Sequence, residues 1–89
     1  MSKISIIGAG FVGSTSAYAL MLKEVADEIA LIDINAELVA AEVADINQGF
    51  EGLSKTRLKA GSYADCKDSD LIVITAGLGR KVGESRLDL

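Results

Sequence analysis

Short apolar runs alternate along this chain with longer stretches in which apolar residues recur every three or four positions. The runs at Lys3–Ile7, Ile29–Ile34 and Leu71–Thr75 are rich in isoleucine, leucine and valine, so they predict β-strands. Arg57–Ala60 predicts a shorter and weaker strand. We expect Ile29–Ile34 and Leu71–Thr75 to be buried strands of a parallel sheet, because their apolar character is almost continuous.

The stretches between these strands predict helices at Ser14–Lys23 and Ala36–Gln48, where apolar residues recur at helical spacing. The expected inner faces are Ala17, Leu20 and Met21 in the first helix and Val39, Val43, Ile46 and Phe50 along the second. We expect the second helix to stop at Gly49, because glycine is common directly after a helix. Tyr63–Ser69 is polar and is expected to be a connection.

The resulting order is strand, helix, strand, helix, strand, connection, strand. Alternation of this kind predicts the α/β class, with a parallel sheet, right-handed crossovers and helices on the faces of the sheet. Residues 76–83 are expected to form a loop, and residues 84–89 to be the first turns of a helix that the sequence cuts off. We therefore interpret the chain as one incomplete domain.

The composition excludes several classes of function. The chain has 89 residues and a net charge of -4, which argues against nucleic acid as a partner because phosphate contacts need a basic face. No apolar run approaches the length of a membrane span, so we expect no membrane partner. A single cysteine, Cys66, allows no internal disulfide and fits a cytoplasmic location. We expect no metal site, and the absence of histidine excludes a histidine acid/base within these residues.

A glycine-rich motif lies between the first predicted strand and the first predicted helix. Gly8 permits a tight turn, Gly10 lets the backbone approach a pyrophosphate, and Gly13 lets the helix pack close to the strand. The free N–H groups at the helix N-terminus favour phosphate binding. The motif predicts a Rossmann-type doubly wound sheet and a dinucleotide cofactor. Its members are Gly8, Ala9, Gly10, Phe11, Val12 and Gly13.

An acidic residue, Asp33, follows at the end of the second predicted strand, twenty residues after Gly13. A carboxylate at this position accepts hydrogen bonds from the ribose hydroxyls of the adenosine half and repels a 2′-phosphate. No arginine follows it closely, so we predict NAD as the cofactor in preference to NADP. The alternative is a surface carboxylate ahead of the turn at Asn35.

These segments together resemble the amino-terminal part of the L-lactate/malate dehydrogenase family. The resemblance is carried in order by ISIIGAGFVGSTSAYAL, VADEIALIDIN, GSYADCKDSDLIVITAG and KVGESRLDL, which span nearly the whole chain. Its most specific parts are Thr75-Ala76-Gly77 and Gly83-Glu84-Ser85-Arg86. The resemblance implies an NAD-dependent oxidoreductase of fermentative metabolism that acts on a small 2-keto or 2-hydroxy acid.

The resemblance also assigns roles to two arginines. Arg86 matches the family's arginine on a closing loop, which polarises the substrate carbonyl during hydride transfer. Arg80 matches the position that contacts the variable end of the substrate, where lactate enzymes usually carry glutamine and malate enzymes arginine. Arg80 therefore favours malate, whereas Glu84 and the amino-acid sequences of the predicted helices favour lactate. Both substrates stay open, with lactate as the first choice.

Further cofactor contacts follow from the same resemblance. Tyr63 matches a residue near the adenine, with a half-buried packing tyrosine as the alternative, and the cofactor segment includes Ala76, Gly77 and Leu78. The family's usual proline is replaced here by Val82, and a lysine sometimes found near the adenosine is replaced by Leu38.

The resemblance implies a homodimer or homotetramer for the complete enzyme. The family's catalytic histidine and substrate domain lie beyond these residues, so we expect the 89 residues alone to be inactive. A non-catalytic nucleotide-binding module is the alternative from another class of function.

Overall fold

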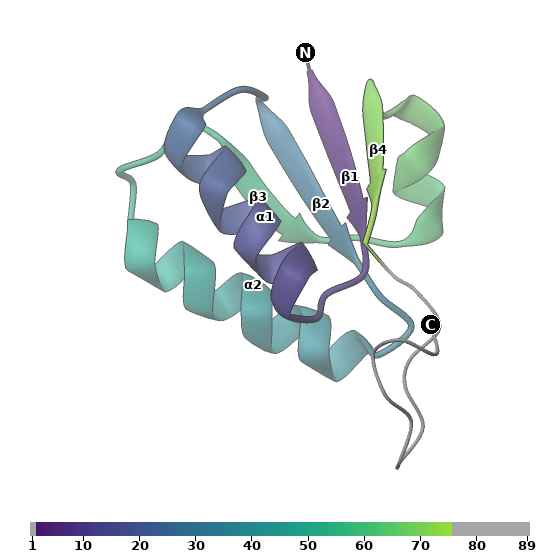
Figure 1. The fold of residues 1–89 in the computed structure, drawn as a ribbon. Coiled ribbons are helices and arrows are strands. Elements are labelled where there is room, and N and C mark those ends of the chain that lie inside the picture. The colour runs from purple at the N-terminus through teal and green to yellow at the C-terminus, as the bar shows by residue number, and fades with distance from the viewer. Residues whose placement is uncertain (1, 76–89) are drawn as a thin grey trace, which may run out of the picture.

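Residues 2–75 form a parallel sheet covered by helices in a computed structural model (Figure 1), and these are the residues that the structure describes. The strands are β1 (Lys3–Ile7), β2 (Glu28–Ile32), β3 (Arg57–Ala60) and β4 (Leu71–Ile74), in the spatial order β3-β2-β1-β4. All neighbouring pairs are parallel. The helices are α1 (Phe11–Lys23), α2 (Ala36–Phe50) and the 3-10 helix η1 (Tyr63–Asp68). The predicted α/β class and parallel sheet are confirmed.

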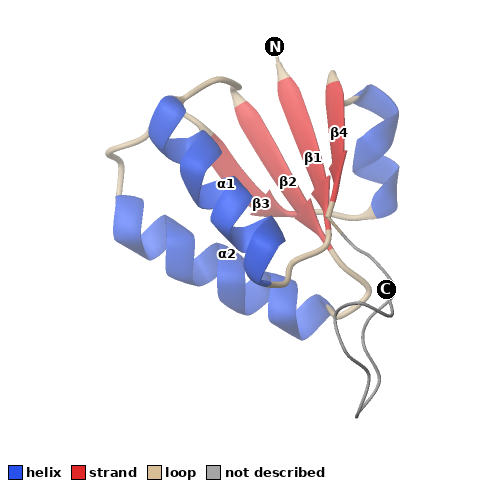
Figure 2. Ribbon diagram, in the orientation of Figure 1, coloured by secondary structure: helices blue, strands red, loops and turns tan. Residues whose placement is uncertain are grey.

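The hydrophobic core lies between one face of the sheet and helices α1 and α2, which lie side by side in Figure 2. Alternate side chains of β1, β2 and β3 point toward these helices, since successive residues of a strand face opposite sides. The predicted inner faces of both helices are confirmed. Core members are Ile4, Ile6, Ala17, Met21, Ile29, Leu31, Val39, Ile46, Phe50 and Leu58, with Leu20, Val43 and Val73 packed against them.

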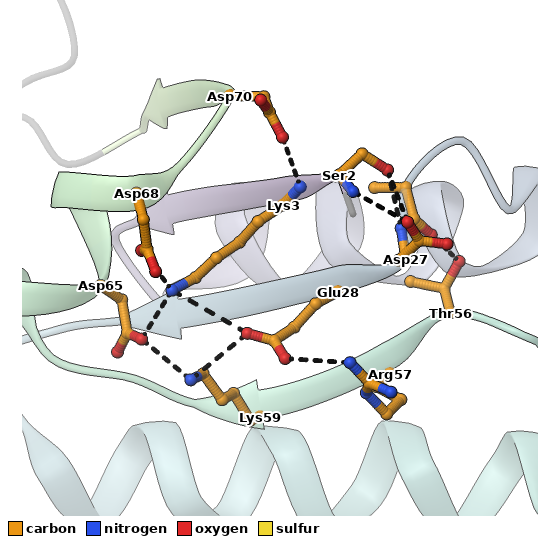
Figure 3. A network of polar contacts seen from close by, with 11 residues as sticks. Ser2, Lys3, Asp27, Glu28, Thr56, Arg57, Lys59, Asp65, Asp68 and Asp70 are labelled. Carbon is orange, nitrogen blue, oxygen red and sulfur yellow. Dashed lines mark hydrogen bonds and ion pairs between the residues drawn. The ribbon is translucent and has the colours of Figure 1, made fainter.

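The opposite face of the sheet carries an ionic network, drawn in Figure 3, which extends to η1. The Nζ atom of Lys3 lies 2.9 Å from Asp65 Oδ1 and 2.8 Å from Asp68 Oδ1. Lys59 Nζ lies 2.9 Å from the same Asp65 oxygen and 3.3 Å from Glu28 Oε1. Hydrogen bonds from Lys59, Lys3 and the Ser62 backbone lower the pKa of Asp65 well below its usual range. The network therefore attaches η1 to β1 and β3.

Both helices differ from their predicted limits. Helix α1 begins at Phe11 rather than Ser14, because Gly13 takes part in its first turn instead of breaking the chain. Helix α2 continues through Gly49 and ends at Phe50, so the predicted stop at Gly49 is wrong. The extra residues bring Phe50 into the core and against the ring of Tyr18, with 5.1 Å between centroids.

The last strand, β4, is less buried than its sequence predicts. Leu71, Ile72 and Ile74 are exposed within residues 2–75, and only Val73 packs against the core. The reason is position, because β4 is an edge strand of the described sheet and has β1 as its only neighbouring strand there. By contrast, β2 is buried on both faces from Ile29 to Ile32, as predicted. The strand ends at Ile32, however, and Ile34 is 89% exposed, so its predicted extension to Ile34 is wrong. Neither α1 nor α2 is long and apolar enough to cross a bilayer.

Candidate nucleotide-binding site

A cleft of about 430 Å³ opens at the carboxyl ends of the strands. Ligands of open α/β sheets bind at this edge, where the loops that follow neighbouring strands diverge. Four segments meet there: the turn after β1, the turn after β2, the start of η1 and the residue that follows β4. The cleft is lined by Ile7, Gly8, Gly10, Phe11, Val12, Gly13, Asp33, Ile34, Tyr63 and Thr75.

The turn after β1 has the geometry that its glycines predict. Gly8 has a φ angle of 111°, a left-handed conformation that side chains rarely adopt. Its N–H donates to the Ile32 carbonyl at 2.7 Å, which joins the turn to the end of β2. A Cβ atom added at Gly13 would overlap the Gly8 carbonyl oxygen and lie 2.7 Å from its carbonyl carbon. Close packing of α1 on the turn therefore requires glycine at position 13.

The N-terminus of α1 offers its backbone N–H groups to the cleft. The first N–H groups of any α-helix have no partner within the helix. Here the N-cap is Gly10, which makes no side-chain capping bond, and the first turn holds no acidic residue. No atom of residues 2–75 lies within 4 Å of a Cβ atom built on Gly10. Unpaired donors, the positive end of the helix dipole and open space together fit a phosphate group.

Asp33 places a negative charge beside this helix N-terminus. Its Oδ2 accepts a hydrogen bond from Ala9 N at 2.9 Å, and its Oδ1 accepts one from Asn35 N at 3.0 Å. These backbone hydrogen bonds, first from Ala9 and then from Asn35, lower the pKa of Asp33. The carboxylate is therefore ionised at neutral pH, and each oxygen keeps acceptor capacity for a ligand hydroxyl. Asp33 also joins the turn after β1 to the turn after β2. Neither the ribose-binding interpretation nor the surface-carboxylate interpretation included this role.

Large exposed apolar side chains form the remaining walls of the cleft. Phe11 is 80% exposed, Ile34 is 89% exposed and Tyr63 is 55% exposed. Tyr63 lines the cleft within residues 2–75, and its exposed fraction agrees with a half-buried side chain as well as with a place near the adenine. Exposed apolar and aromatic surface around a few polar groups is typical of ligand sites.

The structure brings most of the predicted cofactor residues among 2–75 together around the cleft and adds others. It assigned no site role to Ile7, Ile34 or Thr75, which also line the cleft. The signal for Thr75 was its position at the end of an apolar strand, where side chains point to the ligand edge of the sheet. Ala9 is buried and contributes its N–H to Asp33 rather than a side chain to the cleft.

Five residues that the sequence assigned to the cofactor or substrate lie outside the described residues, as does the helix expected at residues 84–89. The five residues are Ala76, Gly77, Leu78, Arg80 and Arg86.

The family model for the NAD-binding domain of lactate/malate dehydrogenases matches residues 2–89. The chain belongs to this family. An L-lactate dehydrogenase of Clostridium perfringens is 54% identical over 88 residues, a match that covers 99% of this chain and 28% of the relative. The chain thus spans somewhat more than a quarter of the length of such family members.

Solved structures of the family share the fold. A minor L-lactate dehydrogenase of Enterococcus mundtii, crystallised in a ligand-bound form, superimposes with a TM-score of 0.85 at 40% identity, over 99% of this chain and 28% of its own. A malate dehydrogenase of Archaeoglobus fulgidus, in complex with NADH, superimposes with a TM-score of 0.79 at 45% identity, over 98% of this chain and 30% of its own. The fold is therefore the amino-terminal part of a Rossmann domain, and NAD is the cofactor of this family domain.

Proposed function

We propose that the protein carrying these residues is an NAD-dependent L-lactate dehydrogenase, which reduces pyruvate with NADH to L-lactate and NAD. The observation that carries the proposal is the meeting of the uncapped N-terminus of α1 with the Asp33 carboxylate in one cleft. In this proposal the helix N-terminus receives the pyrophosphate and Asp33 receives the adenosine ribose. Relatives about half identical to this chain are L-lactate dehydrogenases, which favours lactate.

The charges around the cleft support NAD over NADP. Asp33 is the single charged side chain among the described residues that line it. A 2′-phosphate at the ribose would meet this carboxylate without a nearby lysine or arginine from residues 2–75 to offset it. Such a like-charge contact is unfavourable, whereas the two ribose hydroxyls of NAD can donate hydrogen bonds to the carboxylate oxygens.

The chemical step needs a group that stabilises developing negative charge and a proton donor, and Arg86 would provide the first of these. Bound NADH supplies the hydride, which adds to the carbonyl carbon of the keto acid while a proton goes to the carbonyl oxygen. Arg86 would stabilise the negative charge that develops on that oxygen, as the match to Gly83-Glu84-Ser85-Arg86 implies. The chain holds no histidine, so the proton donor of the family is not among these 89 residues.

Malate dehydrogenase is the second candidate function, and Arg80 is the observation that favours it. A guanidinium that faces the methyl group of pyruvate would be a desolvated charge without a partner. Oxaloacetate has a second carboxylate that can form a bidentate pair with arginine. The family also includes the malate dehydrogenase of Archaeoglobus fulgidus, 45% identical to this chain.

The first test measures kcat/KM of the full-length protein for pyruvate and oxaloacetate with NADH. Faster turnover of pyruvate supports the lactate assignment, and faster turnover of oxaloacetate supports malate. If the protein binds NADH but reduces neither acid, the result would support the alternative of a non-catalytic nucleotide-binding module. Absence of NADH binding would refute the proposed function.

A substitution pair tests the role of Arg80. Arg80→Gln should lower kcat/KM for oxaloacetate at least about tenfold if the guanidinium pairs with the second carboxylate, since hydrogen bonds to charged groups contribute about 1.5–3 kcal/mol. Lys81→Gln is the matched control, because it removes a neighbouring positive charge. An equal effect of both substitutions would indicate general electrostatic attraction instead of a specific contact.

The setting of the enzyme is part of the same proposal. We propose a cytoplasmic homodimer or homotetramer in which residues 1–89 form the first part of the NAD-binding domain. Light scattering on the full-length protein measures the assembly. The 89 residues expressed alone should bind NADH weakly and show no turnover.

A further inference from the structure

The hydroxyl of Thr75 lies at the junction of β1, β4 and the glycine turn. The Thr75 N–H donates to the Ile7 carbonyl at 2.9 Å and extends the pairing of β4 with β1 by one residue. Its Oγ1 lies 3.2 Å from the carbonyl oxygens of both Ile7 and Gly8. The single hydroxyl proton is thus shared between the last carbonyl of β1 and the first carbonyl of the turn.

The Gly8 carbonyl is the group of the turn on which both α1 and Thr75 converge. It is the group against which Gly13 packs, and a Cβ atom built on Gly13 would lie 3.1 Å from Thr75 Oγ1. The hydroxyl and the first turn of α1 therefore both lie close to the Gly8 carbonyl. A shift of the Gly8 peptide would move the N-terminus of α1 and the N–H groups that face the cleft.

Hydrogen bonds from neighbouring strand ends hold the first two residues of the turn. The Gly8 N–H donates to Ile32 at the end of β2, and the Ala9 N–H donates to Asp33 just beyond it. Thr75 supplies the hydrogen bond from the β4 side, to the carbonyl of Gly8. Without it the described contacts hold the turn from one side alone.

We infer that Thr75 is a positioning residue, whose hydroxyl holds the glycine turn so that the N–H groups of α1 point at the cofactor phosphates. The inference rests on the proposed function, since it concerns the affinity for NADH. Strand propensity alone could also account for a threonine here, because β-branched residues favour strands. Valine has the same shape and a similar strand preference but no hydroxyl, so it separates the two explanations.

The experiment measures the dissociation constant for NADH by fluorescence, together with kcat, on the full-length protein. Thr75→Val should raise the dissociation constant about 3- to 10-fold, the effect of losing a hydrogen bond worth roughly 1 kcal/mol. Thr75→Ser keeps the hydroxyl and should stay within about twofold of wild type. The kcat at saturating NADH should change little in both variants, since Thr75 acts through the turn.

The matched control is Thr56→Val, at the amino end of the sheet. Thr56 Oγ1 donates to the Ala26 carbonyl at 2.6 Å, and the residue is 4% exposed. The substitution removes the same kind of hydrogen bond far from the cleft. We expect it to lower the free energy of unfolding and to leave the dissociation constant for NADH unchanged.

Amide hydrogen exchange without cofactor supplies a second readout. Exchange at the Ala9 N–H should be faster in Thr75→Val than in wild type or Thr75→Ser. If Thr75→Val does not fold, Thr75→Ser and Thr75→Ala give the same comparison, because both lack the methyl group and differ in the hydroxyl.

The outcomes separate this inference from the proposed function. Equal dissociation constants in wild type and Thr75→Val, or equal weakening in Thr75→Val and Thr75→Ser, would overturn the role of the hydroxyl while the function stands. A wild-type protein that binds no NADH would overturn the proposed function and the inference together.

Discussion

The contact between Gly13 and the Gly8 carbonyl makes Gly13→Ala the sharpest test of the turn. The added Cβ would overlap the Gly8 carbonyl oxygen and lie 2.7 Å from its carbon. That carbonyl cannot move freely, because the Gly8 N–H is held by Ile32 and its carbonyl by Thr75. Either α1 must move away from β1, or the turn must change its conformation.

The expected magnitude follows from two opposing effects. Overpacking of a filled site costs typically about 1–3 kcal/mol, with backbone shifts at the upper end. Alanine in place of glycine inside a helix gains about 0.5–1 kcal/mol. Because the clash is with backbone, we expect Gly13→Ala to lower the free energy of unfolding by about 1–2 kcal/mol net and to weaken NADH binding as well.

Gly49→Ala is the matched control. Gly49 also lies inside a helix, but no atom of the part of the chain that the structure describes lies within 4 Å of its built Cβ atom. It should gain up to about 1 kcal/mol, the propensity difference alone. Urea unfolding of both full-length variants measures the two effects, which are expected to have opposite signs. Equal stabilisation by both substitutions would show that the turn yields easily and would refute the packing argument.

Three further predictions concern the cleft and the ionic network. The methyl group of Gly10→Ala would enter space that the described residues leave open, so the substitution should cost less than about 1 kcal/mol of stability. It should nevertheless raise the dissociation constant for NADH, measured by fluorescence, about tenfold or more, because the backbone must approach the pyrophosphate closely here. An unchanged dissociation constant would place the phosphates elsewhere. Asp33→Ala and Asp33→Asn should both reduce the preference for NADH over NADPH, and an unaltered preference would make Asp33 a turn residue only. Asp65 has a folded-state pKa below its unfolded value of about 3.9, so its stabilisation is present above that pH and is lost as the pH falls below it. Between pH 5 and pH 3, roughly the range around the unfolded pKa, the free energy of unfolding of Asp65→Asn should therefore fall less than that of wild type, as measured by urea unfolding. An identical fall in both proteins would assign the acid sensitivity to other groups.

Much of this fold follows from local patterns in the sequence. The distribution of apolar residues predicted each strand and both long helices to within a few residues, because short continuous apolar runs and a helical period of 3.6 are both visible in the sequence. The glycine pattern and the carboxylate after the second strand predicted the positions of the cleft residues Gly8, Gly10, Gly13 and Asp33. These features depend on residues close together in the chain, or on the general rule that carboxyl ends of parallel strands share one edge.

The remaining features depend on which strands are neighbours and in what register. Lys3 meets Asp65 across 62 positions of sequence, and Thr75 meets Gly8 across 67. No local pattern encodes such contacts, because they arise only when β4 is placed beside β1. The same placement leaves β4 at the edge of the described sheet, although its sequence is that of a buried strand. The sequence thus determined the elements and the chemistry of the turn, whereas tertiary structure decided which side chains hold that turn in place.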